Sequence, residues 1–231
     1  MTSINQNWSI LRDRIARAAH SVGRAREEIE VIAVSKTRTA QEVEAAHRCG
    51  LNTVGENRVQ EAEEKKALVS APLSWHMIGH LQSNKAGKAV QSFDVVQSVD
   101  RFSLAQALDR RARAIDRRIE VMLQVNTADS ASQSGAHPGQ LVELAGRVAE
   151  LPSLKVCGLM TIGAHSDDEH TVRASFARLR ILKDKVQSAE IANISMRHLS
   201  MGMSGDFEWA IAEGSTMLRL GTALFGARDL V

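Results

Sequence analysis

The stretch Val31-Ile32-Ala33-Val34-Ser35-Lys36-Thr37 sets the pattern that the rest of the chain repeats. Its apolar and β-branched residues indicate a short, fully buried strand, and polar residues end it at once. The next segment, Ala40–Cys49, carries apolar residues at helical spacing. A buried strand followed by an amphipathic helix is the repeating unit of parallel sheets, because two parallel strands need a long crossover between them.

The same unit recurs along the whole chain. Candidate strands are predicted at Val31–Ser35, Asn52–Val54, Ser74–Ile78, Val95–Val99, Glu120–Val125, Lys155–Thr161, Arg197–Ser200 and Thr216–Leu220. Helices are predicted at Trp8–Val22, Ala40–Cys49, Asn57–Leu68, Ser83–Gln91, Arg101–Ile115, Pro138–Glu150, Asp168–Ser188 and Asp206–Ala212. Eight βα units in 231 residues predict a single closed parallel (β/α)8 barrel of the TIM type over residues 1–231, with residues 1–29 forming an extra N-terminal helix and lead-in.

A doubly wound open sheet is the alternative architecture. It is disfavoured because no GxGxxG motif follows the first strand, where a dinucleotide-binding fold places it. No linker rich in Pro, Gly and Ser divides the chain, and the longest small-residue loop, Ala128–Gly135, lies inside a βα unit.

Composition and charge argue against several classes of function. A net charge of +2 is too small to indicate nucleic-acid binding, and the two cysteines, Cys49 and Cys157, form neither a CxxC motif nor a His/Cys cluster for a metal. The N-terminus lacks the apolar core of a signal peptide, and no uncharged apolar stretch approaches bilayer length. These features predict a cytoplasmic protein with no membrane or metal partner.

Polar residues end most of the predicted strands, and a barrel gathers such residues at one mouth, where active sites lie. They include Lys36, Asn57, His80, Asn126, Thr161, Ser200, Arg219 and Thr222, and Gly221 lies directly before Thr222. Lys36 would place its amine beside an apolar interior, which favours the neutral form that attacks aldehydes. This placement indicates Schiff-base chemistry.

The last two loops carry a second signal. Barrels often bind phosphate after strands seven and eight, and Ser200, Gly202, Gly221 and Thr222 suit that task. Arg219, if it points inward, needs an acceptor such as a pyridine nitrogen, because an unpaired buried guanidinium costs several kcal/mol. An amine, a phosphate cradle and a ring-nitrogen donor together describe a site for pyridoxal 5′-phosphate (PLP) held covalently on Lys36.

These residues resemble a known family, the YggS or PROSC family of PLP homeostasis proteins, related to the N-terminal barrel domain of alanine racemase. The resemblance rests on five segments that span nearly the whole chain. They are Val34–Thr37, Gly55–Glu61, Trp75–Lys85, Gly158–Ile162 and Leu199–Gly226.

The resemblance implies a PLP-bearing barrel with the Schiff base on Lys36. It also implies Ser200, Gly221 and Thr222 around the phosphate, Arg219 at the pyridine nitrogen, and Asn57 and His80 near the ring. Members of the family are regarded as regulators of PLP supply and amino-acid balance without an established reaction. In the loop Val125–Gly135 relatives usually carry a lysine where this chain has Gln133, so a role of that second amine is in doubt here.

The residues also bear on the choice between carrier and enzyme. Racemases of this kind use a lysine and a tyrosine on opposite faces of the substrate, and this chain contains no tyrosine. Arginine at the ring nitrogen disfavours the protonation that makes PLP a strong electron sink. The expected function is therefore PLP homeostasis by a monomer, with transient contact with PLP-dependent apoenzymes as a further partnership.

Two alternatives stay open at this point. One is a PLP-dependent amino-acid racemase or related enzyme of low activity, and the other is a phosphate-binding barrel that uses Lys36 as an aldolase-type amine without PLP. The chain ends within about a dozen residues of its last predicted strand, which leaves no room for the racemase's second domain. That ending favours the carrier.

Overall fold

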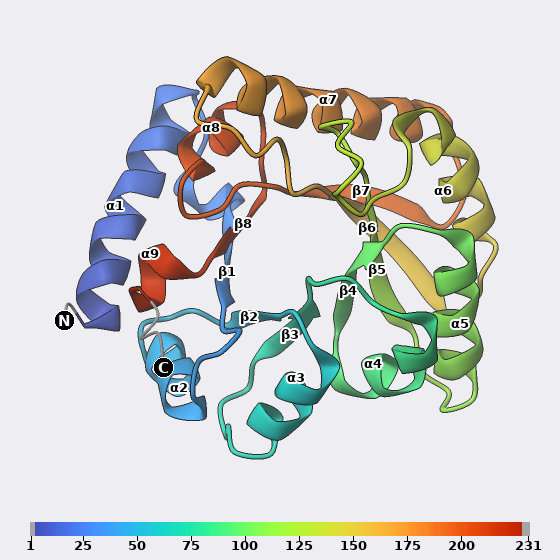
Figure 1. Ribbon diagram of the computed structural model, residues 1–231, viewed down its shortest axis with the longest axis horizontal. Coiled ribbons are helices and arrows are strands. Elements are labelled where there is room, and N and C mark those ends of the chain that lie inside the picture. The colour runs from blue at the N-terminus through green and yellow to red at the C-terminus, as the bar shows by residue number, and fades with distance from the viewer. Residues whose placement is uncertain (1–2, 228–231) are drawn as a thin grey trace.

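A computed structural model describes residues 3–227 and shows a closed parallel barrel whose eight strands pair in chain order (Figure 1). The strands are β1 (Glu30–Val34), β2 (Thr53–Glu56), β3 (Ser74–Met77), β4 (Val95–Val99), β5 (Ile119–Gln124), β6 (Leu154–Met160), β7 (Ile194–Ser200) and β8 (Met217–Leu220). The ring closes where β8 pairs with β1, with Ile32 opposite Arg219. The sequence-predicted barrel is confirmed.

Helices surround the strands, as Figure 1 shows. They are α1 (Ile4–Ser21), α2 (Ala40–Arg48), α3 (Val59–Lys66), α4 (Ala86–Ser92), α5 (Phe102–Arg113), α6 (Leu141–Ala149), α7 (Glu169–Ser188), α8 (Phe207–Ala212) and α9 (Thr222–Phe225), with single 3-10 turns η1 (Arg26–Glu28), η2 (Ser83–Lys85) and η3 (Pro138–Gln140). Because every strand runs in the same direction, the carboxyl ends of all eight meet at one mouth.

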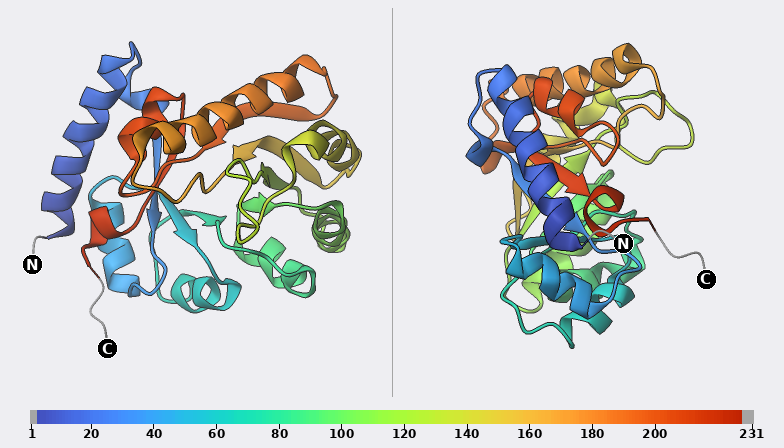
Figure 2. Two further views of the ribbon diagram at one scale, coloured as in Figure 1. Left: turned by 45° about the horizontal axis from the view of Figure 1, so that its top comes forward. Right: turned by 90° about the vertical axis from the view of Figure 1, so that its left-hand side faces the viewer.

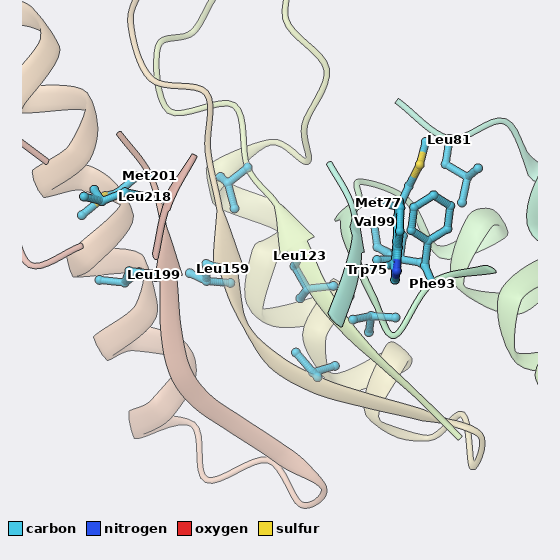
Figure 3. Close-up of a cluster of buried hydrophobic side chains, with 14 of the residues drawn as sticks. Trp75, Met77, Leu81, Phe93, Val99, Leu123, Leu159, Leu199, Met201 and Leu218 are labelled. Atoms are coloured by element: carbon cyan, nitrogen blue, oxygen red, sulfur yellow. The ribbon is translucent and has the colours of Figure 1, made fainter. Parts of the chain in front are cut away.

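The core has two layers, one beneath the helices and one inside the barrel. They are separate because side chains along each strand point alternately to the two faces of the sheet. Side chains that point outward pack beneath the helices; Figure 3 shows Trp75, Met77, Leu81, Phe93 and Val99 gathered at one such place. A smaller separate cluster fills the inside of the barrel, with members Ile32, Val95, Met122, Cys157, Met160 and Met217. Several polar side chains share this interior, and they matter for the site.

The extra N-terminal helix is also confirmed. It begins earlier than Trp8 because Ser3 and Gln6 form a capping box that starts the helix at Ile4. Helix α1 lies on the outside of the barrel beside α8 and α9 (Figure 2). The Asn7 amide donates to the Leu224 carbonyl at 2.9 Å, which joins the two ends of the described chain.

Some predicted boundaries were wrong. Strand β2 begins and ends one to two residues later than predicted, so Glu56 lies inside the strand. Strand β7 begins at Ile194, because pairing with β6 extends it past the apolar run. The predicted helix Ser83–Gln91 is a 3-10 turn followed by α4, and the short helix α9 after β8 was not predicted.

Candidate functional site

The centre of the barrel mouth is a buried cation. Arg219 is 5% exposed, and its Nη1 and Nη2 groups donate to the Ser200 hydroxyl and the Thr161 carbonyl, each at 2.7 Å. Burial lowers the pKa of Arg219 to about 10, and the nearby Asp206 carboxylate acts in the opposite direction. The guanidinium is therefore a cation at neutral pH, and it forms no ion pair with a carboxylate within residues 3–227.

This arrangement leaves Arg219 with donors to spare. A guanidinium carries five N–H groups and has no acceptor, and the hydrogen bonds that it makes within residues 3–227 use two of them. Both partners are uncharged oxygens at the ends of β6 and β7. A ligand with a lone pair or negative charge would therefore be stabilised at this mouth.

Lys36 lies at the same mouth, in the turn that follows β1. The Arg38 N–H donates to the Ser35 carbonyl at 2.9 Å, and Thr37 has a φ of 64°, so the chain turns sharply at the lysine. The Lys36 side chain is half-buried. Strand pairing sets β1 directly beside β8, which brings the lysine turn next to the strand that carries Arg219.

A buried ion pair anchors the start of that turn. The Lys65 ammonium donates to a Glu56 carboxylate oxygen at 2.6 Å and to the Ser35 carbonyl, and the Ser35 hydroxyl donates to the same carboxylate oxygen at 2.6 Å. Burial raises the pKa of Glu56, while the two donors oppose that shift. The pair ties the ends of β1 and β2 to α3 directly before Lys36.

The predicted phosphate residues Gly221 and Thr222 follow β8 and are accessible at the mouth. A Cβ at Gly221 would lie 3.5 Å from the Val34 Cβ, so this glycine sits against the end of β1. The Ala223 N–H in the first turn of α9 donates to the Ser204 hydroxyl at 3.1 Å. Ser204 thus joins the loop after β7 to the loop after β8, a role that the sequence did not reveal.

Gly202 has a different reason to be glycine. Its φ is 95°, and a Cβ there would lie 2.5 Å from the Ala210 Cβ of α8. Close packing against α8, together with the left-handed backbone, requires this glycine.

Asn57 and His80 lie together at another part of the mouth. Both line a cavity of about 370 Å³ with Met77, Lys85 and other residues after β2 and β3. His80 itself is exposed, and its Nδ1 is 3.7 Å from an Asp100 carboxylate oxygen.

The histidine of β3 that points into the barrel is His76. It is 3% exposed and lies in hydrogen-bonding contact with Gln97. Neither residue was singled out from the sequence, although a histidine and a glutamine within otherwise apolar strands were a usable signal.

Ser200 is fully buried beneath Arg219. Its hydroxyl accepts from the guanidinium and donates to the Gln97 carbonyl oxygen at 2.7 Å, so its one hydrogen is already bound within the protein. The predicted role of Ser200 at the phosphate stays a prediction. Gln133, where the resemblance led us to expect lysine, donates to the Gly163 carbonyl at 2.9 Å and joins the loops after β5 and β6.

The described residues offer neither a metal site nor a membrane-spanning helix. Within residues 3–227 no group of three His, Cys, Asp or Glu side chains lies close enough to hold a metal ion. No helix in that same part of the chain combines the length and apolar character needed to cross a membrane.

Comparison with known proteins identifies the relatives of this barrel. The family model of the alanine racemase N-terminal domain matches residues 3–229. The pyridoxal phosphate homeostasis protein of Pseudomonas aeruginosa is 44% identical over 231 residues, covering 99% of this chain and 97% of that protein. The chain belongs to the family of pyridoxal phosphate homeostasis proteins.

Solved structures extend the likeness to three dimensions. PipY of Synechococcus elongatus, solved with PLP bound, has a TM-score of 0.85 and 35% identity and covers 97% of this chain and 100% of its own. An alanine racemase of Clostridium difficile has a TM-score of 0.75 at 14% identity, and 57% of that racemase is matched. The racemase shares the fold of the barrel.

Proposed function

We propose that this protein binds PLP at the barrel mouth, holds it as a Schiff base on Lys36, and serves in intracellular PLP homeostasis and amino-acid balance rather than in a defined reaction. The observation that carries the proposal is the buried Arg219 cation, which keeps N–H groups that form no hydrogen bond within residues 3–227. Arg219 lies on β8, and β8 pairs with β1, the strand that Lys36 follows. PLP supplies an aldehyde for the amine, a lone pair for the guanidinium and a phosphate dianion for the loops.

The residues present fit this cofactor. Arg219 would donate to the pyridine nitrogen, and because it cannot accept a hydrogen bond, it selects the unprotonated ring. Gly221 and Thr222, at the accessible start of α9, would donate to the phosphate together with the loop that begins at Ser200. Asn57 and His80, which share a cavity, would lie along the ring. The relative PipY was solved with PLP bound.

The protein would act in the cytoplasm as a monomer, with PLP as its ligand and PLP-dependent apoenzymes as transient recipients. The curated relative is a PLP homeostasis protein that this chain matches over almost its full length. Arginine in place of a carboxylate at the ring nitrogen keeps PLP a poor electron sink, which suits storage better than catalysis.

Borohydride trapping tests the covalent link. The purified protein, incubated with PLP and reduced, is expected to gain one pyridoxyl phosphate on Lys36 by mass mapping, and Lys36→Ala is expected to lose it while remaining folded. Lys85→Ala is the matched control, since Lys85 lines the neighbouring cavity, and it is expected to keep the modification. Unchanged trapping in Lys36→Ala contradicts the assignment.

Pyridoxal without its phosphate tests the cradle. Charge-assisted hydrogen bonds contribute about 1.5–3 kcal/mol each, so losing two of them is expected to weaken binding at least a hundredfold. The Kd values of PLP and pyridoxal, compared by absorbance titration, decide the matter. Equal affinities would show that the loops after β7 and β8 do not bind phosphate.

A further inference from the structure

A chain of four hydrogen bonds runs through the barrel interior and ends on Arg219. The Arg219 Nη1 group donates to the Ser200 hydroxyl at 2.7 Å, and that hydroxyl donates to the Gln97 carbonyl oxygen at 2.7 Å. The Gln97 amide nitrogen is 2.8 Å from His76 Nδ1, and the Ser74 hydroxyl is 3.1 Å from His76 Nε2. The chain crosses from β8 through β7 and β4 to β3.

The contacts in the structure and the chemistry of these groups together give each bond a direction. A guanidinium only donates, so the Ser200 oxygen accepts from Arg219, and the Ser200 hydroxyl in turn donates to the Gln97 carbonyl oxygen. The NH₂ end of the Gln97 amide then faces His76, whose Nδ1 must be the acceptor. His76 is therefore a neutral ring protonated at Nε2, which donates to Ser74.

Burial supports this protonation state. His76 is 3% exposed, and loss of solvation lowers its pKa to about 4, although the Glu30 and Asp94 carboxylates act in the opposite direction. A protonated His76 would direct an N–H toward the NH₂ group of Gln97. The amide would then have to turn over, and its NH₂ group would replace the acceptor that Ser200 needs.

We propose that Gln97, acting through Ser200, is the positioning residue of Arg219, and that His76 determines which end of the Gln97 amide faces Ser200. The inference rests on the proposed PLP site, because the role given to Gln97 is to hold the Arg219 guanidinium where it would donate to the ring nitrogen. Arginine has many rotamers, and the hydrogen bonds that hold this one among the described residues go to the Ser200 hydroxyl and the Thr161 carbonyl.

Two substitutions test the chain from different positions. Gln97→Met keeps an unbranched side chain of similar length but removes the acceptor for Ser200, and Ser200→Ala removes the acceptor for Arg219. Each is expected to weaken PLP binding about tenfold, which corresponds to about 1.4 kcal/mol, and to shift the visible absorbance maximum of bound PLP. Circular dichroism and thermal unfolding check the fold of each variant.

Ser98→Ala is the matched control. Ser98 is the next residue on β4, it is fully buried, and its hydroxyl has no hydrogen-bond partner within the part of the chain that the structure describes. Its loss is expected to leave both the Kd and the absorbance maximum unchanged. A shift as large as that of Ser200→Ala would show that any buried polar change produces the effect, and would overturn the proposal.

Two substitutions of His76 separate positioning from packing. Asparagine places its carbonyl oxygen near the position of Nδ1 and keeps an acceptor for Gln97, whereas leucine offers none. His76→Asn is expected to keep the absorbance maximum of the parent protein, and His76→Leu is expected to shift it as Gln97→Met does. Equal spectra for the two variants would contradict the role of His76.

One further measurement uses the parent protein alone and therefore does not depend on the folding of a variant. NMR of the PLP-free parent protein is expected to show His76 as the neutral tautomer protonated at Nε2, and the tautomer protonated at Nδ1 would overturn the proposal. The outcomes also separate the two claims. A parent protein that binds no PLP refutes the proposed function, whereas a spectrum that shifts in Arg219→Met but not in Gln97→Met or Ser200→Ala refutes only the positioning chain.

Discussion

Single polar side chains inside the barrel are the residues on which the site depends. Arg219, Ser200, Gln97 and His76 are all at most 5% exposed, so each needs an internal partner to offset the loss of solvent. The bonds between them meet this need, and Arg219 keeps N–H groups that form no hydrogen bond within residues 3–227. Because the pKa of His76 is lowered, its neutral state can be tested by measurements on the protein without PLP.

The stability of the protein is expected to depend on pH through His76. Its pKa is about 4 in the folded protein against 6.5 ordinarily, so between these values the unfolded chain binds more protons. The contribution to the free energy of unfolding is fully present above pH 6.5 and is lost as pH falls toward 4, by roughly 3 kcal/mol in all. Urea unfolding between pH 4.5 and 7.5 measures it.

Comparison with His76→Asn isolates this residue from other titrating groups. The variant is expected to lose roughly 2 kcal/mol less than the parent protein between pH 7.5 and 4.5, because the asparagine does not titrate. His165→Asn, on an exposed loop, is the control and is expected to follow the parent protein. Identical pH dependence in all three proteins would show that His76 is not held neutral.

At the scale of elements, the site depends on how closely the loops after neighbouring strands pack against each other. Gly79, after β3, packs directly on the backbone of Asn57, after β2. A Cβ at Gly79 would lie 2.5 Å from the Asn57 carbonyl oxygen and 2.7 Å from its Cα. Backbone atoms cannot move aside as a flexible side chain can, so this contact fixes the loop that carries Asn57.

Gly79→Ala is therefore expected to displace the Asn57 loop and to weaken PLP binding. The overpacking is expected to reduce the free energy of unfolding by about 1–3 kcal/mol. Gly146→Ala is the matched control, because Gly146 lies in α6 with open space at its Cβ position, and alanine there is expected to stabilise the helix by up to about 1 kcal/mol. Wild-type affinity and stability in Gly79→Ala would refute the argument.

The elements were largely predictable, because the barrel repeats one unit and each unit has a clear hydrophobic period. Lys36 and Arg219 could be found as polar residues at the ends of β1 and β8. Ser204 and Gln97 could not be assigned roles, since these depend on which strands and loops face one another across the ring. The start of β7 was missed because strand pairing, and not its own apolar pattern, defines it.

The whole molecule shares its barrel fold with the alanine racemase of Clostridium difficile. The match spans 57% of the racemase from Clostridium difficile and 94% of this chain. Racemisation needs an acid and a base on opposite faces of the substrate carbon, and this chain has no tyrosine to serve as one of them. Under the proposed function, Lys36 and Arg219 would bind and orient PLP.

Proton exchange at Cα of an amino acid tests whether the protein acts as a carrier or as a racemase. An Arg219 that donates to the ring nitrogen, as proposed, would disfavour its protonation, so the PLP-loaded protein is expected to exchange the alanine Cα proton for deuterium slowly, as followed by NMR. Arg219→Glu supplies the carboxylate that electron-sink enzymes use and is expected to speed exchange, with weaker PLP binding because a buried carboxylate must be paired or protonated. Exchange by the parent protein at a racemase's rate would overturn the carrier assignment and establish an enzyme.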